Sequence, residues 1–228
     1  MSSSLVQHVA SIIRNSCENL PDLKPHHNAY PIIEKKYIFI VNEMHECRGL
    51  RKVHLETGYT DNIEVMHCVL YPDPEYPIPI FGADIVATPT VVTAAIADIS
   101  PVYKTDKIYK KLGKLASKYE FKEKRPLPEW ADIFSPYCQF MRLRNEEEKS
   151  LYGCMIEEFI DFYVDIVKKA KKDNDWVNTM LRFDDQIHYC KQQRKNKKTK
   201  AVLSKWFSPE FAEGYINDIL FDIPPIPK

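Results

Sequence analysis

Apolar residues recur at two different periods along the chain, and the change of period separates helical stretches from extended ones. Leu5, Val9 and Ile13 are spaced along one helical face near the N-terminus, which predicts an amphipathic helix there. From about residue 35 to 102 the chain is rich in β-branched and aromatic residues, in short runs separated by breaks. This pattern predicts strands joined by hairpins into an antiparallel meander. The expected strands cover residues 37–41, 51–56, 63–71, 80–88 and 91–99.

The remaining segments predict a loop and further helices. The stretch 71–79 carries four prolines, which lack the N–H that a sheet ladder needs, so a rigid loop is expected. After Val102 a helical stripe begins, formed by Ile108, Leu112, Leu115 and Tyr119. A long helix is expected over about 146–172, because its first turn is acidic and its last turn basic, as the helix dipole favours. Ser208 and Pro209 are typical of the cap and first turn of a last helix that ends before Pro224.

A sheet with helices before and after it predicts an α+β layered sandwich, and 228 residues suit one domain spanning 1–228. The 44% hydrophobic content is enough for a packed core, which excludes a broadly disordered chain. The formal net charge of zero excludes a globally basic polyanion binder. No apolar run reaches membrane-spanning length, and residues 1–20 lack the pattern of a signal peptide. We therefore expect a cytoplasmic protein, with the plastid stroma or the cytoplasm of an infected host as alternatives, and we expect a monomer.

The residues that bind metals and nucleotides are not arranged in any familiar motif. Six cysteines stand at 17, 47, 68, 138, 154 and 190, without a CxxC pair or the spacing of a zinc or iron–sulfur site. Reduced thiols and no metal are expected. With only six glycines, and neither a GxGxxG nor a GxxxxGK[ST] loop, the chain has no dinucleotide or phosphate-binding signature. Electrons for any redox reaction would have to come from outside.

Three polar residues interrupt the apolar pattern of the predicted strands. His67 shares a period-two face with Val65 and Val69, where a histidine is more often a satisfied core residue than a catalyst. Asp84 lies between apolar neighbours, and aspartate is disfavoured in strands, although a structural hydrogen bond would account for it. Glu56 and His54 share the opposite face from Val53 and Leu55, which also fits the wet face of a half-buried strand.

Taken together, these positions suggest a shared chemistry. In an antiparallel meander, neighbouring strands could bring Glu56, His67 and Asp84 to one patch of the sheet. A buried pair of Asp84 and His67 would titrate as a unit and could hold and release protons near neutral pH. Such a site suits the protonation of a bound organic substrate and requires no nucleophile.

Several segments resemble the ferredoxin-dependent bilin reductase family. The signature region is similar over 67–74 (HCVLYPDP) and 78–86 (IPIFGADIV). The branch of phycocyanobilin:ferredoxin oxidoreductases is resembled by the segments 51–56, 94–101, 133–138 and 186–196. The similar segments run in order from about residue 47 to 221 and so cover most of the chain.

The resemblance implies a three-layer α/β/α sandwich with a central, mainly antiparallel sheet flanked by helices. Biliverdin IXα would lie between the sheet and the C-terminal helices. It would be reduced by four electrons to phycocyanobilin, with electrons from reduced [2Fe–2S] ferredoxin and no cofactor bound by the chain itself. Phycoerythrobilin as the product is the alternative within the same fold.

The resemblance also assigns roles to residues. Asp84 would be the central proton donor, His67 its partner at the lactam end, and Glu56 the donor to the D-ring vinyl group, supported by His54. The remaining substrate-binding candidates are Arg142, Lys198, Thr93 and Asn196. The segment from Glu56 to His67 is about one residue shorter than is usual in the family, and Lys197 replaces an acidic residue. Both departures bear on the product, whereas glutamate rather than aspartate at position 56 favours phycocyanobilin.

Two stretches are strongly basic. The first comprises Lys104, Lys107, Lys110, Lys111, Lys114, Lys118, Lys122, Lys124 and Arg125. The second comprises Lys191, Arg194, Lys195, Lys197, Lys198, Lys200 and Lys205. Each could be a solvated helix face, or one or both could guide an acidic ferredoxin to the site. The rival functions are a non-enzymatic bilin carrier and a nucleic-acid binder, but the latter would leave the polar residues of the strands unexplained.

Overall fold

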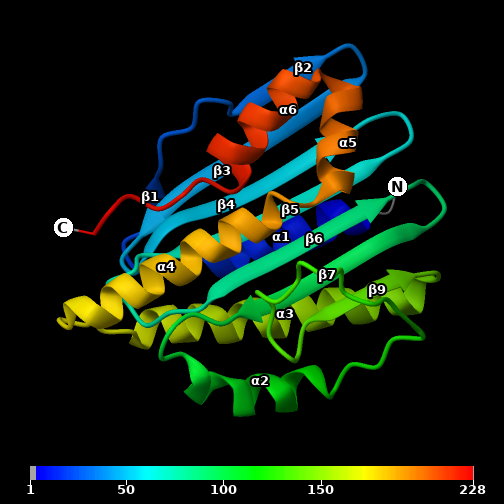
Figure 1. Ribbon diagram of the computed structural model, residues 1–228. Coiled ribbons are helices and arrows are strands. Elements are labelled where there is room, and N and C mark those ends of the chain that lie inside the picture. The colour runs from blue at the N-terminus through cyan, green and yellow to red at the C-terminus, as the bar shows by residue number, and fades with distance from the viewer. Residues whose placement is uncertain (1–3, 228) are drawn as a thin grey trace.

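A nine-stranded antiparallel sheet forms the centre of the molecule (Figure 1). The computed structural model describes residues 4–227. The strands run in the order β1-β3-β4-β5-β6-β7-β9-β8, and β2 also pairs with β3. Their bounds are β1 Lys24–Pro25, β2 Ile32–Lys35, β3 Ile38–Cys47, β4 Leu50–Tyr59, β5 Glu64–Pro72, β6 Ile80–Ala87, β7 Val92–Ser100, β8 Glu123–Lys124 and β9 Gln139–Leu143. The five predicted strands correspond to β3 to β7, which form the expected meander.

Helices cover both faces of this sheet. Helices α1 (Leu5–Cys17) and α3 (Glu146–Lys169) pack together behind it, with α2 (Tyr109–Ala116) beside α3 (Figure 1). In front lie α4 (Trp176–Gln193), α5 (Lys197–Trp206) and α6 (Pro209–Tyr215). A short 3₁₀-helix, η1, spans Asp106–Ile108 before α2, and one turn of π-helix, η2, continues α6 over Ile216–Leu220. The predicted α+β sandwich with three layers is confirmed.

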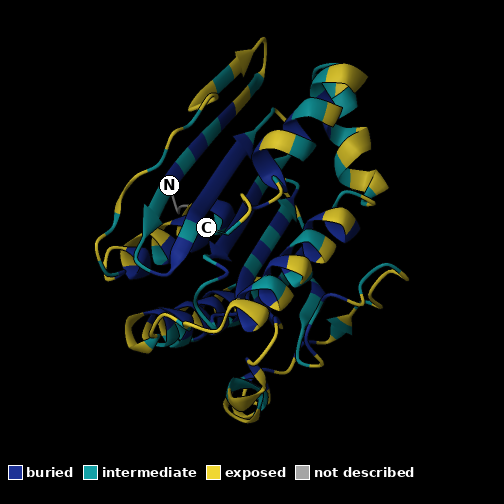
Figure 2. Ribbon diagram, turned by 60° about the vertical axis from the view of Figure 1, so that its left-hand side comes forward, coloured by how far each residue is buried: buried dark blue, intermediate teal, exposed yellow. Residues whose placement is uncertain are grey.

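The strands divide their side chains between two hydrophobic cores, because successive residues of a strand point to opposite faces. One core lies against α1 and α3 and receives Leu55, Cys68 and Ile85 from the strands. The other lies against α4, α6 and η2 and receives Val69 and Ile80. In Figure 2 the innermost strands β4 and β5 are almost wholly buried and other strands alternate between dark blue and teal, whereas the helices carry exposed residues on their outer sides. Both faces of the sheet are therefore buried over most of their area.

The ends of the helices follow local capping rules. The side chain of Asn145 accepts from the backbone N–H of Glu148 and so caps α3, which ends at Lys169, three residues before its predicted end. Ala170 adopts an extended conformation there and stops the helix. Ser208 caps α6, with Pro209 in its first turn, as predicted. Within residues 4–227, no helix is long and apolar enough to cross a membrane.

Candidate active site

The three polar residues singled out in the strands form one straight row across the sheet. Glu56 on β4 is paired with His67 on β5, and His67 is paired with Asp84 on β6. The row extends to Asn42 on β3 and Ile96 on β7, which are the register partners of Glu56 and Asp84. All of these side chains share the face of the sheet toward the C-terminal helices. The predicted shared patch of Glu56, His67 and Asp84 therefore exists, at the spacing of adjacent strands.

His67 and Asp84 form a hydrogen-bonded ion pair. Nδ1 of His67 lies 2.6 Å from Oδ1 of Asp84. Burial lowers the pKa of His67, but the charge of Asp84 and the hydrogen bond to it raise that pKa more, so the net shift is upward. An imidazolium is thus favoured. At the other end of this ring, Nε2 is buried and has no hydrogen-bond partner among the described residues, which leaves one donor directed away from Asp84.

The expectation that Asp84 is buried with its partner is wrong. The side chain of His67 is 10% exposed, but that of Asp84 is 42% exposed. Asp84 begins a partly exposed strip of the sheet that continues over Ile96 on β7 and Phe140 on β9. Apolar neighbours in the sequence therefore misled the prediction, since they point to the opposite face. The carboxylate is solvated on one side and bound to an imidazole on the other.

Glu56 is a buried carboxyl group with a hydroxyl partner. The residue is 4% exposed, and its Oε2 accepts a hydrogen bond of 2.6 Å from the hydroxyl of Tyr215 at the end of α6. Burial raises the pKa of Glu56, and this effect outweighs the lowering by His67 and by Tyr215. This upward shift of the pKa is toward the protonated form, which suits Glu56 to holding a proton beside His67.

His54 supports this arrangement from the next position on the same face of β4. Its Nε2 lies 2.7 Å from Oδ1 of Asn42, and its ring meets the ring of His67 edge-on at 5.7 Å between centroids. Burial lowers the pKa of His54 well below the ordinary value, so this imidazole is neutral. A neutral His54 next to a cationic His67 avoids the repulsion that two buried imidazolium ions would cause.

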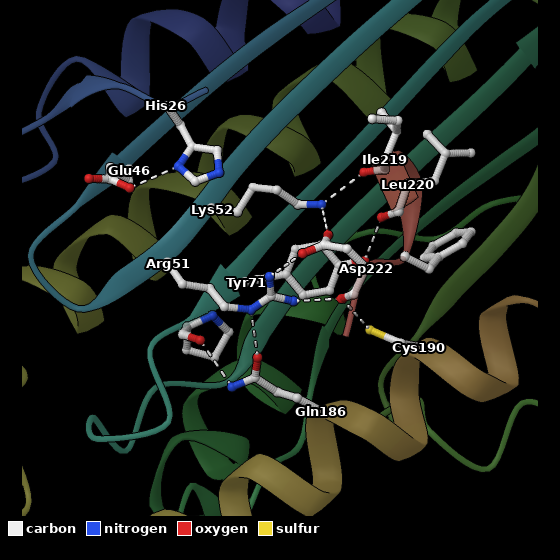
Figure 3. A network of polar contacts seen from close by, with 12 residues as sticks. His26, Glu46, Arg51, Lys52, Tyr71, Gln186, Cys190, Ile219, Leu220 and Asp222 are labelled. Atoms are coloured by element: carbon white, nitrogen blue, oxygen red, sulfur yellow. Dashed lines mark hydrogen bonds and ion pairs between the residues drawn. The ribbon is translucent and has the colours of Figure 1, made fainter. Parts of the chain in front are cut away.

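The C-terminal segment after α6 forms the wall of the site and is fastened through its backbone. Figure 3 shows the contacts that hold it, which come from β4, β5 and α4. Successive carbonyl groups accept from side chains: Ile219 from Lys52, Leu220 from Tyr71, Phe221 from Arg194, and Asp222 from Arg51 and Cys190. The Asp222 carboxylate also forms ion pairs with Arg51 and Lys52. We call this set of contacts the C-terminal clamp.

The clamp sets the position of an aromatic ring over the site. The ring of Phe221 meets the ring of His67 edge-on, with 5.4 Å between centroids. Phe221 itself is 4% exposed, so it excludes water from this side of His67. The row is thus covered over His67 and Glu56 and partly exposed at Asp84.

Of the four remaining candidate residues, Arg142, Thr93 and Asn196 are engaged in local contacts. Arg142 on β9 forms a 3.5 Å ion pair with Glu123. It lies two residues after Phe140, on the same face of the strand. The hydroxyl of Thr93 donates to the carbonyl of Val86. Asn196 caps α5, and Lys198 is exposed in the first turn of that helix. These four residues do not form a cluster of their own.

Sequence reasoning missed several residues that shape the site. Asn42 could have been noticed, because it continues the period-two face of Ile38 and Ile40 as a polar residue. Tyr215 and Phe221 gave no such signal, since an aromatic residue in or after a C-terminal helix is expected to belong to the hydrophobic core. The described residues contain no group of three or more His, Cys, Asp or Glu side chains placed to hold a metal ion.

Comparison with known proteins decides the family. The family model described as ferredoxin-dependent bilin reductase matches residues 13–222. The chain belongs to this family. Phycocyanobilin:ferredoxin oxidoreductase of Synechococcus sp. (strain CC9902) is 39% identical over 98% of this chain and 94% of that protein. The enzyme of the same name from Prochlorococcus marinus (strain MIT 9303) is 39% identical over 97% of this chain and 87% of that protein.

A solved structure shows that this bilin reductase has the fold of a known relative. The crystal structure of phytochromobilin synthase from tomato, in complex with biliverdin, superimposes with a TM-score of 0.81. The match covers 96% of this chain and 83% of that one, at 16% sequence identity. The predicted membership in the family and the predicted fold are both confirmed.

Proposed function

We propose that this bilin reductase converts biliverdin IXα to phycocyanobilin, with four electrons from reduced [2Fe–2S] ferredoxin and four protons taken up through its own side chains. The observation that carries the proposal is the in-register row of Glu56, His67 and Asp84. An acid, an imidazolium and a half-exposed carboxylate stand side by side on one face of the sheet. The relatives named phycocyanobilin:ferredoxin oxidoreductase, at 39% identity, support this product and this electron donor, and the biliverdin complex of the tomato enzyme supports this substrate.

The three residues of the row are proposed to have different roles in proton transfer. Asp84, reached from the open side, receives the pyrrole nitrogens and lactam oxygens and passes on the proton that it shares with His67. The free Nε2–H of His67 is directed at the lactam end. Glu56, neutral and buried, protonates the D-ring vinyl group. Proton donation by a positioned side chain typically contributes about 10²–10⁴-fold to a rate.

Substrate carboxylates would be held at the edges of the site. Arg142 follows the partly exposed strip of β9, and Lys198 is exposed at the start of α5, so each can meet a propionate. Thr93 and Asn196 are engaged with Val86 and with the first turn of α5, so their part is to shape the backbone near the pocket. We propose that the protein acts as a single-domain monomer.

Ferredoxin is proposed to dock on the second basic stretch. This stretch spans the end of α4 and all of α5, in the layer that covers the active-site face of the sheet (Figure 1). Lys191, Lys195 and Lys197 are exposed there. Most of the first basic stretch lies around α2, beside α3 of the opposite layer, and only its last residues, Lys124 and Arg125, reach the edge of the sheet at β8. Opposite charges would accelerate the encounter of an acidic ferredoxin with the surface near the row.

Anaerobic turnover tests the proposed function directly. The chain is incubated with biliverdin, ferredoxin and a reducing system, and the bilins are separated by chromatography. Phycocyanobilin is the expected product. Phycoerythrobilin would overturn the assignment of the product, and unchanged biliverdin that stays bound would show a bilin carrier instead of an enzyme.

A further inference from the structure

The hydroxyl of Tyr215 occupies the centre of a buried hydrogen-bond chain that ends at Glu56. It lies 2.6 Å from Oε2 of Glu56 and within 2.9 Å of both polar atoms of the Asn42 amide. Tyr215 is 2% exposed and Asn42 is 4% exposed, so water does not compete for these contacts. Tyr215 lies on α6, far from Glu56 in the sequence but held against it by the packing of α6 on the sheet.

The donors and acceptors of this chain fix the direction of each hydrogen bond. Nδ2 of Asn42 lies 2.8 Å from the carbonyl oxygen of Tyr30, which can only accept, so the orientation of the amide is determined. Its second N–H is directed at the Tyr215 oxygen. Oδ1 of Asn42 accepts from the Nε2–H of neutral His54. We assign the one hydrogen of the Tyr215 hydroxyl to its shortest contact, 2.6 Å to Oε2 of Glu56, rather than to Oδ1 of Asn42 at 2.9 Å, which already accepts from His54.

This direction determines which oxygen of Glu56 can carry a proton. Because Oε2 accepts from Tyr215, the acid proton of a neutral Glu56 resides on Oε1, the oxygen that Tyr215 does not contact. We propose that Tyr215, oriented by Asn42 and His54, is the positioning residue that presents the Oε1 proton of Glu56 for the vinyl reduction. This inference rests on the proposed role of Glu56 as the donor in that step.

The chemical consequence is a stabilised product of proton transfer. As ferredoxin supplies an electron, the Oε1–H bond of Glu56 breaks and its proton joins a carbon of the vinyl group. Glu56 is left as a carboxylate, and the hydrogen bond from Tyr215 is stronger to this charged form. A second electron from ferredoxin and a second proton from solvent complete the reduction of that double bond. Tyr215 itself transfers no proton, because burial and the charge of Glu56 raise the pKa of its hydroxyl.

The test compares Tyr215→Phe with the wild type and with Tyr30→Phe. Tyr30 is the matched control, because its ring packs against that of Tyr215 at 6.2 Å between centroids, yet it takes part in the chain only through its backbone carbonyl. In Tyr215→Phe we expect the Glu56-dependent step to slow by roughly 10- to 100-fold, the value of one hydrogen bond to a charged group. A bilin reduced by two electrons then accumulates, while biliverdin affinity and the other reduction stay within about twofold. Tyr30→Phe should release the wild-type products.

The ratio of two-electron to four-electron product is the decisive reading, because a general loss of stability would lower both products together. Asn42→Ser removes the orienting amide from the other end of the chain and is expected to shift the ratio in the same direction. Glu56→Gln tests the role of Glu56 as proton donor separately from the positioning role of Tyr215. If Glu56→Gln stalls but Tyr215→Phe and Asn42→Ser give wild-type product ratios, the inference about Tyr215 is overturned. If Glu56→Gln forms the four-electron product at the wild-type rate, the role of Glu56 fails first.

Discussion

Glu56 and His67 face each other across the β4–β5 ladder and are both biased toward their protonated forms, for opposite electrostatic reasons. Burial alone favours the neutral form of each group, which protonates Glu56 but would deprotonate His67. The carboxylate of Asp84 reverses the outcome for His67. His54, one position along β4, has no such carboxylate and stays neutral. A single aspartate at the right register therefore distinguishes the two histidines.

Asp84→Asn tests this distinction in the reaction. The amide can still accept from Nδ1 of His67 but can neither hold a negative charge nor pass on a proton. We expect the affinity for biliverdin to stay within the same order of magnitude while turnover falls by about 10²–10⁴-fold. Binding is followed by the absorbance of the bound bilin and turnover by loss of biliverdin. Asp132→Asn is the matched control, since Asp132 pairs with His188 on the exposed surface; turnover of Asp84→Asn at the wild-type rate would remove Asp84 from the mechanism.

The raised pKa of His67 also predicts a pH-dependent contribution to stability. The folded state binds the imidazole proton more tightly than the unfolded chain does, whose histidine pKa is about 6.5. The contribution is therefore complete below pH ~6.5 and is lost as the pH rises through the folded-state value. Urea unfolding of the wild type and of His67→Gln should show the larger difference in unfolding free energy at about pH 6, and a smaller one at about pH 9. A difference that grows with pH would contradict the ion pair.

For individual residues, the sequence predicted the row of Glu56, His67 and Asp84 but not the residues that pack around it. A period-two pattern places Glu56, His67 and Asp84 on definite faces, and a meander puts neighbouring strands side by side. Tyr215 reaches Glu56 only because α6 packs on the sheet, and such a contact leaves no local pattern. The exposure of Asp84 was not predictable either, since it depends on where the helices of the front layer end.

The C-terminal clamp shows how a short element without long-range pattern is held. Its carbonyl groups accept from Lys52, Tyr71 and Arg51, so the segment is recognised mainly through its backbone. Lys52 has a side chain only 4% exposed, and its charge is balanced by Asp222. Burial nevertheless lowers the pKa of Lys52 and would favour its neutral form more strongly if Asp222 were absent.

Removing the carboxylate of the clamp should destabilise the protein. Asp222→Ala leaves the buried Lys52 without its counter-charge, and breaking a buried ion pair typically costs about 3–5 kcal/mol. Because Asp222 is itself partly exposed, we expect a loss near ~3 kcal/mol in the free energy of unfolding, measured by urea denaturation. The matched control is Asp165→Ala, from an exposed pair with Lys169, for which a change within about 0.5 kcal/mol is expected. Equal effects of the two substitutions would show that the clamp contributes no stability.

Long elements with a clear period were predictable, and short or mixed ones were not. The five central strands and α3 were recognised, because their apolar residues recur over many positions. Strands β8 and β9, with two and five residues, are too short to show a period, and β1 and β2 pair only at the edge of the sheet. Helix α4 shows no clear apolar period, since it buries polar residues such as Arg182 and Gln186.

On the scale of the whole molecule, the sheet separates stability from chemistry. The face toward α1 and α3 carries the larger apolar core, whereas the face toward α4 to α6 carries the polar row. Substitutions in the first core are expected to change folding alone, whereas those in the row on the second face are expected to change the reaction. The proposed docking of ferredoxin on the second basic stretch places the electron donor on the same side of the sheet as the row.

Charge substitutions on the two basic stretches test this geometry. Lys191→Gln, Lys195→Gln and Lys197→Gln together neutralise exposed positions near α5, while Lys107→Gln, Lys110→Gln and Lys111→Gln do the same near α2. We expect the first set to raise the KM for ferredoxin several-fold at low salt, and the second to leave it within about twofold. Rising salt should raise the KM of the wild type for ferredoxin toward that of the first variant, because the screening length falls to roughly 10 Å at 0.1 M. A larger effect of the α2 set, or a salt-independent KM, would exclude this docking surface.

The most direct test of the account is the number of ferredoxin electrons consumed per biliverdin, measured anaerobically for the wild type and for Glu56→Gln. If different residues of the row supply the protons for the two reductions, the wild type consumes four electrons and forms phycocyanobilin. Glu56→Gln then consumes two and stops at a bilin that retains one of its vinyl groups. Four electrons consumed by Glu56→Gln at the wild-type rate would contradict the account.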